Sequence, residues 1–244
     1  MATFKLILEY DGTAYAGWQR QPNQPTVQEA VETAVRSVSQ TAIPVIAAGR
    51  TDAGVHALGQ VVSFITEKSL SSGEWLRALN ATLPEDISAR SVERTADDFH
   101  ARYSAVRKLY AYRILHRPER SALERTRAWH VYGKLNLDAM REAAKHLVGK
   151  YDCSSFQGRP TDVENPICDL QRLEIVRDQD IVRIELEADR FLKQMVRAMV
   201  GTLVEVGQEK RKPEEMKKIL DAKDRRAAGY TAPAHGLYLV AVTY

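Results

Sequence analysis

The sequence predicts an α+β fold in which two ferredoxin-like halves, residues 1–100 and 101–244, join into one mainly antiparallel sheet with a central cleft. Two observations predict this fold. Strand-like and helix-like patterns follow one another in the order β-α-β-β-α-β twice along the chain, which is the order of a split βαβ unit. The joint near residues 95–105 is short and does not have the composition of a flexible linker, so we expect one continuous sheet.

The elements of the first half follow from alternating or apolar runs, which predict strands, and from apolar residues at helical spacing, which predict helices. The first helix is expected to begin at Thr26, with Glu29 completing a capping box. The predicted elements are strands over 3–10, 43–49, 59–66 and 87–95, and helices over 26–40 and 72–83.

The second half repeats this order without obvious residue-level identity, so the repeat is one of architecture. Its last helix is followed by an additional short helix before the final strand. The predicted elements are strands over 106–115, 168–178, 180–189 and 236–244, and helices over 136–149, 190–207 and 212–222.

The composition is that of a globular protein, with 44% hydrophobic and 27% charged residues among 244. No apolar run approaches the ~20 residues of a membrane span, and the N-terminus lacks the basic start and apolar core of a signal peptide. The two cysteines, Cys153 and Cys168, are typical of a reducing compartment rather than of a disulfide framework. We therefore expect a cytoplasmic protein with no membrane partner.

Motifs of several enzyme classes are missing from the sequence. Gly12 and Gly17 are followed by Trp-Gln, where a phosphate-binding loop requires Lys and Ser or Thr. The six histidines have no i, i+4 pair and the cysteines form no Cys-x-x-Cys, so we expect no metal site. No Gly-x-Ser-x-Gly motif of a serine nucleophile is present. These patterns predict chemistry without a metal or a cofactor.

Positive charge is concentrated in residues 100–130, which hold eight Lys or Arg residues against two Glu. Aromatic residues are interleaved with these charges. A basic surface with stackable rings is typical of nucleic-acid binding, whereas a solvated charged face is the alternative. The basic residues are Arg102, Arg107, Lys108, Arg113, Arg117, Arg120, Arg125 and Arg127.

The stretch "GRTDAGVHA", residues 49–57, carries Arg50 and Asp52 at the end of an apolar run. In an extended segment the side chains at i and i+2 point to the same side, and a guanidinium beside a carboxylate keeps it ionised. An ionised carboxylate can serve as a nucleophile or a base. Taken alone, the same residues also suit an ordinary turn that Asp52 merely caps.

The stretch "GRTDAGVHALGQVVSF" resembles the signature loop of the tRNA pseudouridine synthase A family, within the pseudouridine synthase superfamily. The resemblance extends along almost the whole chain, with the family's motifs in its order and spacing. These motifs are "YDGTAYAGWQRQ", "NATLPEDI", "FHARYSAVRKLYAYRI", "FLKQMVRAMVGTL" and "TAPAHGLYLVAVTY".

The resemblance implies an isomerase, an intramolecular transferase that converts uridine to pseudouridine without a cofactor. It implies that Asp52 is the catalytic aspartate, and the sequence leaves open whether Asp52 attacks the ribose or starts a proton abstraction from it. Tyr110 in "KLYAYR" matches the family's active-site tyrosine, for which an ordinary strand tyrosine is the alternative. Arg50 resembles the loop arginine that helps to hold the substrate open. Arg197 in "MVR" resembles the helix arginine that faces the aspartate, and a solvent-facing helix residue is its alternative.

The same resemblance implies that the partner is tRNA, bound in the central cleft, with the target at positions 38–40 of the anticodon stem-loop. It also implies a homodimer. His100, Arg102, Arg107 and Lys108 are the candidate RNA-binding residues. Three alternatives stay open: a paralogous synthase acting on other RNA positions, a tRNA-binding protein without catalytic activity, and a structural dimer whose basic surface is incidental.

Overall fold

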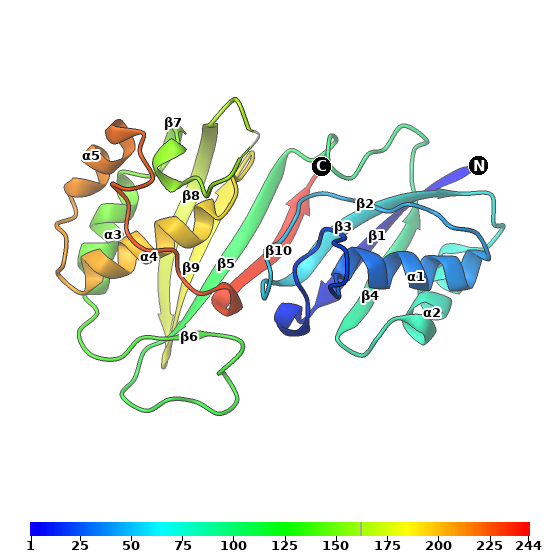
Figure 1. The fold of residues 1–244 in the computed structure, drawn as a ribbon, viewed down its shortest axis with the longest axis horizontal. Coiled ribbons are helices and arrows are strands. Elements are labelled where there is room, and N and C mark those ends of the chain that lie inside the picture. Colours follow the sequence, from blue (N-terminus) through cyan, green and yellow to red (C-terminus); the bar gives the residue numbers. More distant parts are fainter. Residues whose placement is uncertain (162) are drawn as a thin grey trace. The chain divides into compact units, whose positions relative to one another are not determined.

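The computed structural model describes residues 1–161 and 163–244. The chain forms two compact units, which are described separately (Figure 1). The first unit comprises residues 1–106 and 238–244, and the second comprises residues 107–237. The division expected from the sequence, at residue 100, differs from this one because residues 101–106 and the C-terminal strand belong to the first unit.

The strands of the first unit lie in the order β4-β1-β3-β10, with the short β2 on β3. β1 pairs antiparallel with both β3 and β4, whereas β10 pairs parallel with β3 through Tyr238 and His56. The strands are β1 (Ala2–Tyr10), β2 (Ile46–Ala47), β3 (His56–Thr66), β4 (Ile87–Arg94) and β10 (Leu237–Thr243).

Two capped helices complete the first unit, α1 (Val27–Ser39) and α2 (Ser72–Thr82). The Thr26 side chain accepts a hydrogen bond from Glu29 N, as predicted, but the Glu29 carboxylate accepts from Arg20. The reciprocal capping box lies instead at α2, where Ser71 and Glu74 each bond the backbone N–H of the other. Each helix start therefore has one of its free amides satisfied by a side chain.

The core of the first unit follows from the alternation of β1, in which Leu6, Leu8 and Tyr10 are buried. Phe64 of β3 and Trp75 of α2 pack edge to face, with ring centroids 5.1 Å apart. The predicted strand over 43–49 is wrong in length. Only Ile46–Ala47 pairs with β3, because Pro44 has no N–H to donate and the Val45 N–H donates to the Glu32 side chain of α1.

The strands of the second unit lie in the order β5-β9-β8-β7, with all three pairs antiparallel, and β6 pairs parallel with the end of β5. The sequence did not predict β6 or β7, which have only two and four residues. The strands are β5 (Arg107–Leu115), β6 (Trp129–His130), β7 (Gly149–Asp152), β8 (Ile167–Asp178) and β9 (Ile181–Ala188).

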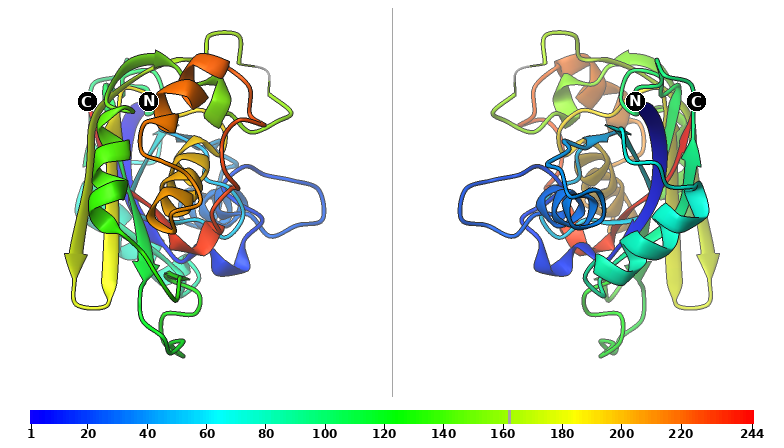
Figure 2. Two further views of the ribbon diagram at one scale, coloured as in Figure 1. Left: turned by 90° about the vertical axis from the view of Figure 1, so that its left-hand side faces the viewer. Right: turned by 90° about the vertical axis from the view of Figure 1, so that its right-hand side faces the viewer.

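Three helices belong to the second unit: α3 (Leu137–Lys145), α4 (Met195–Gly207) and α5 (Glu215–Ala222). Figure 2 shows α4 and α5 on one face of the strands of this unit. The predicted start of α4 at residue 190 is wrong, because Gln194 has a left-handed backbone with φ of 57° and the helix begins after it. Short 3₁₀ turns occur at Gly12–Ala14, Ser154–Phe156 and Ala234–Gly236.

The α+β class and the mainly antiparallel pairing are confirmed within the described residues. The first six elements follow the predicted β-α-β-β-α-β order. The second repeat contains β6 and β7 in addition, and its expected last strand, β10, pairs with β3 of the first unit. Because β3 and β10 are so distant in the sequence, their parallel pairing leaves no local sequence pattern that could predict it.

Candidate active site

Residues 48–55, which we call the Asp52 loop, connect β2 to β3 in the first unit. The loop leaves β2 with Ala48 N donating to Val61 O at 2.8 Å. It then turns back through Val55 N, which donates to Asp52 O at 3.1 Å. Gly54 takes φ of +76°, a backbone conformation that favours glycine. A tight turn therefore sets the backbone directly after Asp52.

The backbone of residues 15–18 holds the Asp52 loop from outside. Trp18 N donates to Thr51 O at 3.0 Å, and Gly54 N donates to Tyr15 O at 3.3 Å. Gly17 has φ of +103°, and a Cβ there would lie 2.7 Å from Thr51 O. Only glycine fits so close to the loop, so Gly17 allows these two backbone segments to pack together.

Buried side chains hold the loop from the sheet. The hydroxyls of Tyr10 and Thr51 are hydrogen-bonded at 2.9 Å, and Gln60 Nε2 donates to Gly49 O at 2.8 Å. Burial raises the pKa of Tyr10 to about 12, so the phenol stays protonated above the pH at which a solvent-exposed tyrosine ionises. The residues on the N-terminal side of Asp52 are therefore fixed by two long-range hydrogen bonds.

Burial along the loop alternates, with Arg50 exposed, Thr51 buried and Asp52 half-buried. This alternation is what an extended segment gives when its middle residue faces the core. Thr51 is the inward residue. Arg50 and Asp52 thus lie on the outer side of the segment.

The far end of the loop is set by His56, which is 2% exposed. Its Nδ1 accepts a hydrogen bond from Gly12 N at 3.0 Å, and its ring stacks on Tyr238 of β10 at 4.7 Å. A Cβ on Gly12 would lie 2.0 Å from Val55 O, so this close approach also requires glycine. The turn after β1 therefore supports the far end of the loop.

Sequence reasoning missed the supporting residues Tyr10, Thr51, His56 and Gln60. Gln60 offered one signal, since it is a polar residue within the apolar run "ALGQVVSF" and is fully buried. A buried amide in a strand needs hydrogen-bond partners, and here the partner is the carbonyl of Gly49 at the start of the loop.

Tyr110 lies in the middle of β5 in the second unit, paired with Leu186 of β9. It is 7% exposed, and its ring packs edge-on against Phe191 at 5.0 Å. Tyr112, two residues further along, is fully buried and donates to Pro233 O at 2.7 Å. Burial also raises the pKa of Tyr112 well above its usual range. Tyr110 is thus held by ring packing within its unit.

Arg197 lies in the first turn of α4 and is half-buried. Its Nε donates to Ala232 O at 2.8 Å, while Ala232 N donates to Arg197 O at 3.0 Å. This reciprocal pair joins the helix to the segment that leads into β10. The side chain is therefore oriented by the fold and is not a freely solvated helix residue.

The four candidate RNA-binding residues are divided between the units, with His100 and Arg102 in the first and Arg107 and Lys108 in the second. His100 Nδ1 accepts hydrogen bonds from the backbone N–H of Arg102 and of Tyr103, both at 3.2 Å. The His100 ring stacks on Tyr103 at 4.3 Å, and the Arg102 guanidinium lies 5.6 Å from the same ring. Tyr103 is 77% exposed, so this cluster presents a ring and a cation to solvent.

The candidate catalytic residues are divided in the same way. Arg50 and Asp52 belong to the first unit, and Tyr110 and Arg197 to the second. Within the described residues, no group of three or more His, Cys, Asp or Glu side chains is arranged to hold a metal ion. In the same part of the chain, no helix is both long and apolar enough to span a membrane.

Comparison with known proteins identifies the family. A profile of the tRNA pseudouridine synthase family matches residues 6–104 and 143–244, segments that include Asp52, His100, Arg102 and Arg197. Tyr110, Arg107 and Lys108 lie between them.

Relatives named tRNA pseudouridine synthase A align over essentially the whole chain. The relative from Acetivibrio thermocellus is 43% identical over 244 residues, covering all of both chains. The relative from Rhodopseudomonas palustris is 45% identical over 245 residues with the same coverage. The relative from Geobacillus kaustophilus is 46% identical over 98% of this chain and 93% of its own. The chain belongs to the tRNA pseudouridine synthase family, and it is an enzyme of the isomerase class.

Proposed function

We propose that this enzyme converts uridine to pseudouridine at positions 38–40 of the anticodon stem-loop of tRNA, with Asp52 as the catalytic residue. The observation that carries the proposal is the construction of the Asp52 loop. Buried hydrogen bonds hold Gly49 and Thr51 on one side of Asp52, and a tight turn fixes the other side. Such support is what a catalytic group needs, because a small misplacement costs much of the rate.

The reaction is an isomerisation, so its atoms balance within the nucleotide. The N1–C1′ bond breaks, the base turns, and a C5–C1′ bond forms, while C5 loses a proton and N1 gains one. The Asp52 carboxylate either attacks the ribose or removes a proton from it, and both routes require the ionised form. No external oxidant, reductant or cofactor is needed for this balance.

The other residues take roles that suit their surroundings. Tyr110 stacks against the extruded base, Arg50 helps to hold the substrate open, and Arg197 contributes to substrate binding. His100, Arg102, Arg107 and Lys108 bind the RNA, the first two from the exposed cluster around Tyr103. The proposal includes a homodimer in the cytoplasm, as the family resemblance implies.

The test is pseudouridine formation by the purified protein on an anticodon stem-loop with a single uridine at position 38, 39 or 40. Conversion of these substrates is expected, with no conversion of a stem-loop whose only uridine is at position 35. Conversion at other positions alone would identify a paralogous synthase. Binding without any conversion would identify a tRNA-binding protein that has no catalytic activity.

A further inference from the structure

A recess in the second unit, of about 430 Å³, lies between β6 with the residues that follow it and the C-terminal end of α4. We call it the β6 recess. Asn136 N donates to Gly207 O at 2.8 Å and joins its two sides. A Cβ on Gly207 would lie 2.7 Å from Leu135, so the chain packs tightly beneath it. The recess is thus built on fixed backbone.

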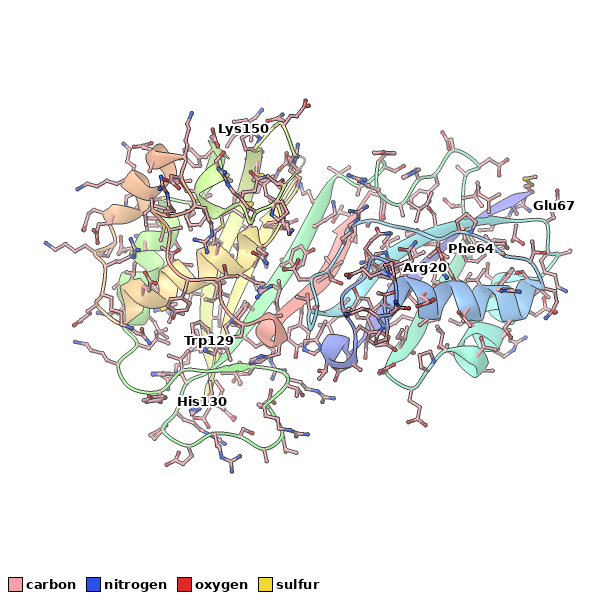
Figure 3. All side chains as sticks on the ribbon, in the orientation of Figure 1. Arg20, Phe64, Glu67, Trp129, His130 and Lys150 are labelled. Carbon is pink, nitrogen blue, oxygen red and sulfur yellow. The ribbon has the colours of Figure 1, made fainter. Side chains whose placement is uncertain are left out.

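Aromatic side chains line the recess. Trp129 is held edge-on by Tyr112 at 6.2 Å and by Tyr230 at 5.6 Å, with both rings nearly perpendicular to the indole. His130 bonds Arg117 O through Nε2 at 2.9 Å, and its ring lies 6.0 Å from that of Tyr132. Figure 3 shows Trp129 and His130 next to each other on this part of the unit. The recess therefore has oriented rings on its walls.

The ring of Tyr132 is accessible to solvent, since the residue is 74% exposed. Two lysines line the recess with it, Lys134 and Lys210. Lys134 pairs with Glu209 at 2.7 Å, and Lys210 is exposed. An exposed ring beside a lysine offers stacking to a base and a charge to its phosphate.

The wall of the recess also contains a buried hydrogen-bond acceptor. Gln208 also lines the recess, and its Oε1 is buried without a hydrogen-bond partner among residues 1–161 and 163–244. Because this oxygen is fully covered by the protein, it is a polar group in the wall of the recess and is not itself open to a ligand.

We propose that the β6 recess binds one unstacked nucleotide of the RNA substrate, apart from the uridine that reacts. The base stacks on Tyr132, while its phosphate binds Lys210. The loop of residues 116–128 leads directly into β6 and carries four arginines against two glutamates, which favours a polyanion at this place. RNA as the ligand rests on the proposed function, but nucleotide binding does not require catalysis to be measured.

The chain contains its own probe for this binding. Trp18 and Trp75 are 2% and 0% exposed, whereas Trp129 is half-buried and lines the recess. A short oligoadenylate should therefore quench tryptophan fluorescence in a saturable way, and Trp129→Phe should abolish the quenching. Equal quenching by inorganic tripolyphosphate would overturn the proposal, because it would reduce the recess to an anion site. Absence of quenching in an enzyme that isomerises uridine would overturn it and leave the proposed function intact.

A second experiment uses Tyr132→Ala, with Tyr151→Ala as the matched control at an exposed tyrosine of β7 in the same unit. Loss of one stacked base should weaken oligoadenylate binding about tenfold, and the control should leave it unchanged. Equal weakening by both variants, or none by either, would overturn the proposal. A change of oligomeric state confined to Tyr132→Ala would show that a second copy of the chain covers the recess, which also overturns it.

Discussion

The Asp52 loop of the first unit and residues 116–128 of the second unit, the basic loop, both follow a strand but are held differently. The first is anchored by a buried threonine, a buried glutamine and two close glycine contacts. The second is held by partly buried ion pairs, such as Arg117 with Asp180 at 3.1 Å, and its Leu123 is 83% exposed.

The difference fits two kinds of interaction with RNA. Catalysis depends on the position of a reacting group to within fractions of an ångström, so the carboxylate needs a buried scaffold. Phosphate binding depends on charge, which tolerates adjustable geometry and is sensitive to salt. Substitutions in the first loop should therefore change the rate of reaction, and substitutions in the second should change affinity and its dependence on salt.

The largest effect is expected for Asp52→Asn, which keeps the shape of the side chain but removes its charge. Single-turnover pseudouridine formation on a stem-loop should fall by a hundredfold or more, while binding of tRNA changes little. Asp98→Asn, at an exposed carboxylate of the same unit, is the control and should keep wild-type activity. A rate for Asp52→Asn above a few per cent of wild type would remove Asp52 from the catalytic role.

The second prediction tests whether the buried hydrogen bonds of the Asp52 loop promote catalysis by fixing the position of the Asp52 carboxylate. Thr51→Val keeps the size of the side chain and removes the hydroxyl that bonds Tyr10. We expect kcat to fall by about tenfold to a hundredfold with KM nearly unchanged, and Thr51→Ser, which keeps the hydroxyl, to retain most of the activity.

The matched control is Thr3→Val, because Thr3 is equally buried in the first unit and its hydroxyl donates to Asp97 O at 3.2 Å. This variant should be less stable than the wild type but should keep the wild-type kcat. Equal losses of kcat in Thr3→Val and Thr51→Val would show that general destabilisation is responsible. An effect confined to KM would show that Thr51 serves binding.

A smaller effect is expected in the basic loop. Arg120→Gln and Arg125→Gln together should flatten the log–log dependence of tRNA affinity on salt by about one to two units, since each phosphate contact contributes ~0.9. The single-turnover rate at saturating tRNA should stay at the wild-type value. Arg117 is left in place because it pairs with Asp180.

Arg183→Gln on β9 is the control for general charge loss, because Arg183 pairs with Glu185 at 2.8 Å. Its salt dependence should match that of the wild type. If the double variant also matches the wild type, the two arginines of the basic loop face solvent in the complex and the RNA lies elsewhere.

The two loops also differ in how far the sequence could predict them. Asp52 was assigned through a motif of consecutive residues, and the charge of the basic loop is visible from composition alone. The anchors of the Asp52 loop were not predictable locally, since Tyr10 bonds Thr51 across 41 positions of the chain. The prediction of where α4 begins was wrong for another reason, because nothing in "FLKQMVR" signals the left-handed backbone at Gln194. Strands and helices with clear periodicity, such as β1 and α1, were predicted to within about two residues.

The smallest expected effect is on the pH dependence of stability. It distinguishes the buried phenol of Tyr10 from the exposed phenol of Tyr132. Because the pKa of Tyr10 is about 12 in the folded chain and 10.0 in its ordinary state, the unfolded chain loses this proton first as pH rises. Stability due to Tyr10 is therefore fully present below pH 10 and is lost between about pH 10 and 12, by at most ~2–3 kcal/mol. Tyr10→Phe should lower the free energy of unfolding at pH 8 but reduce its fall between pH 8 and 11.

Denaturant unfolding at both pH values gives this measurement, and Tyr132→Phe is the matched control in the other unit. Tyr132 is 74% exposed, so removal of its hydroxyl should leave the alkaline loss of stability unchanged. Other buried tyrosines contribute to the same loss, among them Tyr112, which is why only the difference between variants is informative. If the free energy of unfolding falls between pH 8 and 11 by as much in Tyr10→Phe as in the wild type, the Tyr10 phenol is not desolvated. The Asp52 loop would then lack the buried anchor that distinguishes it from the basic loop.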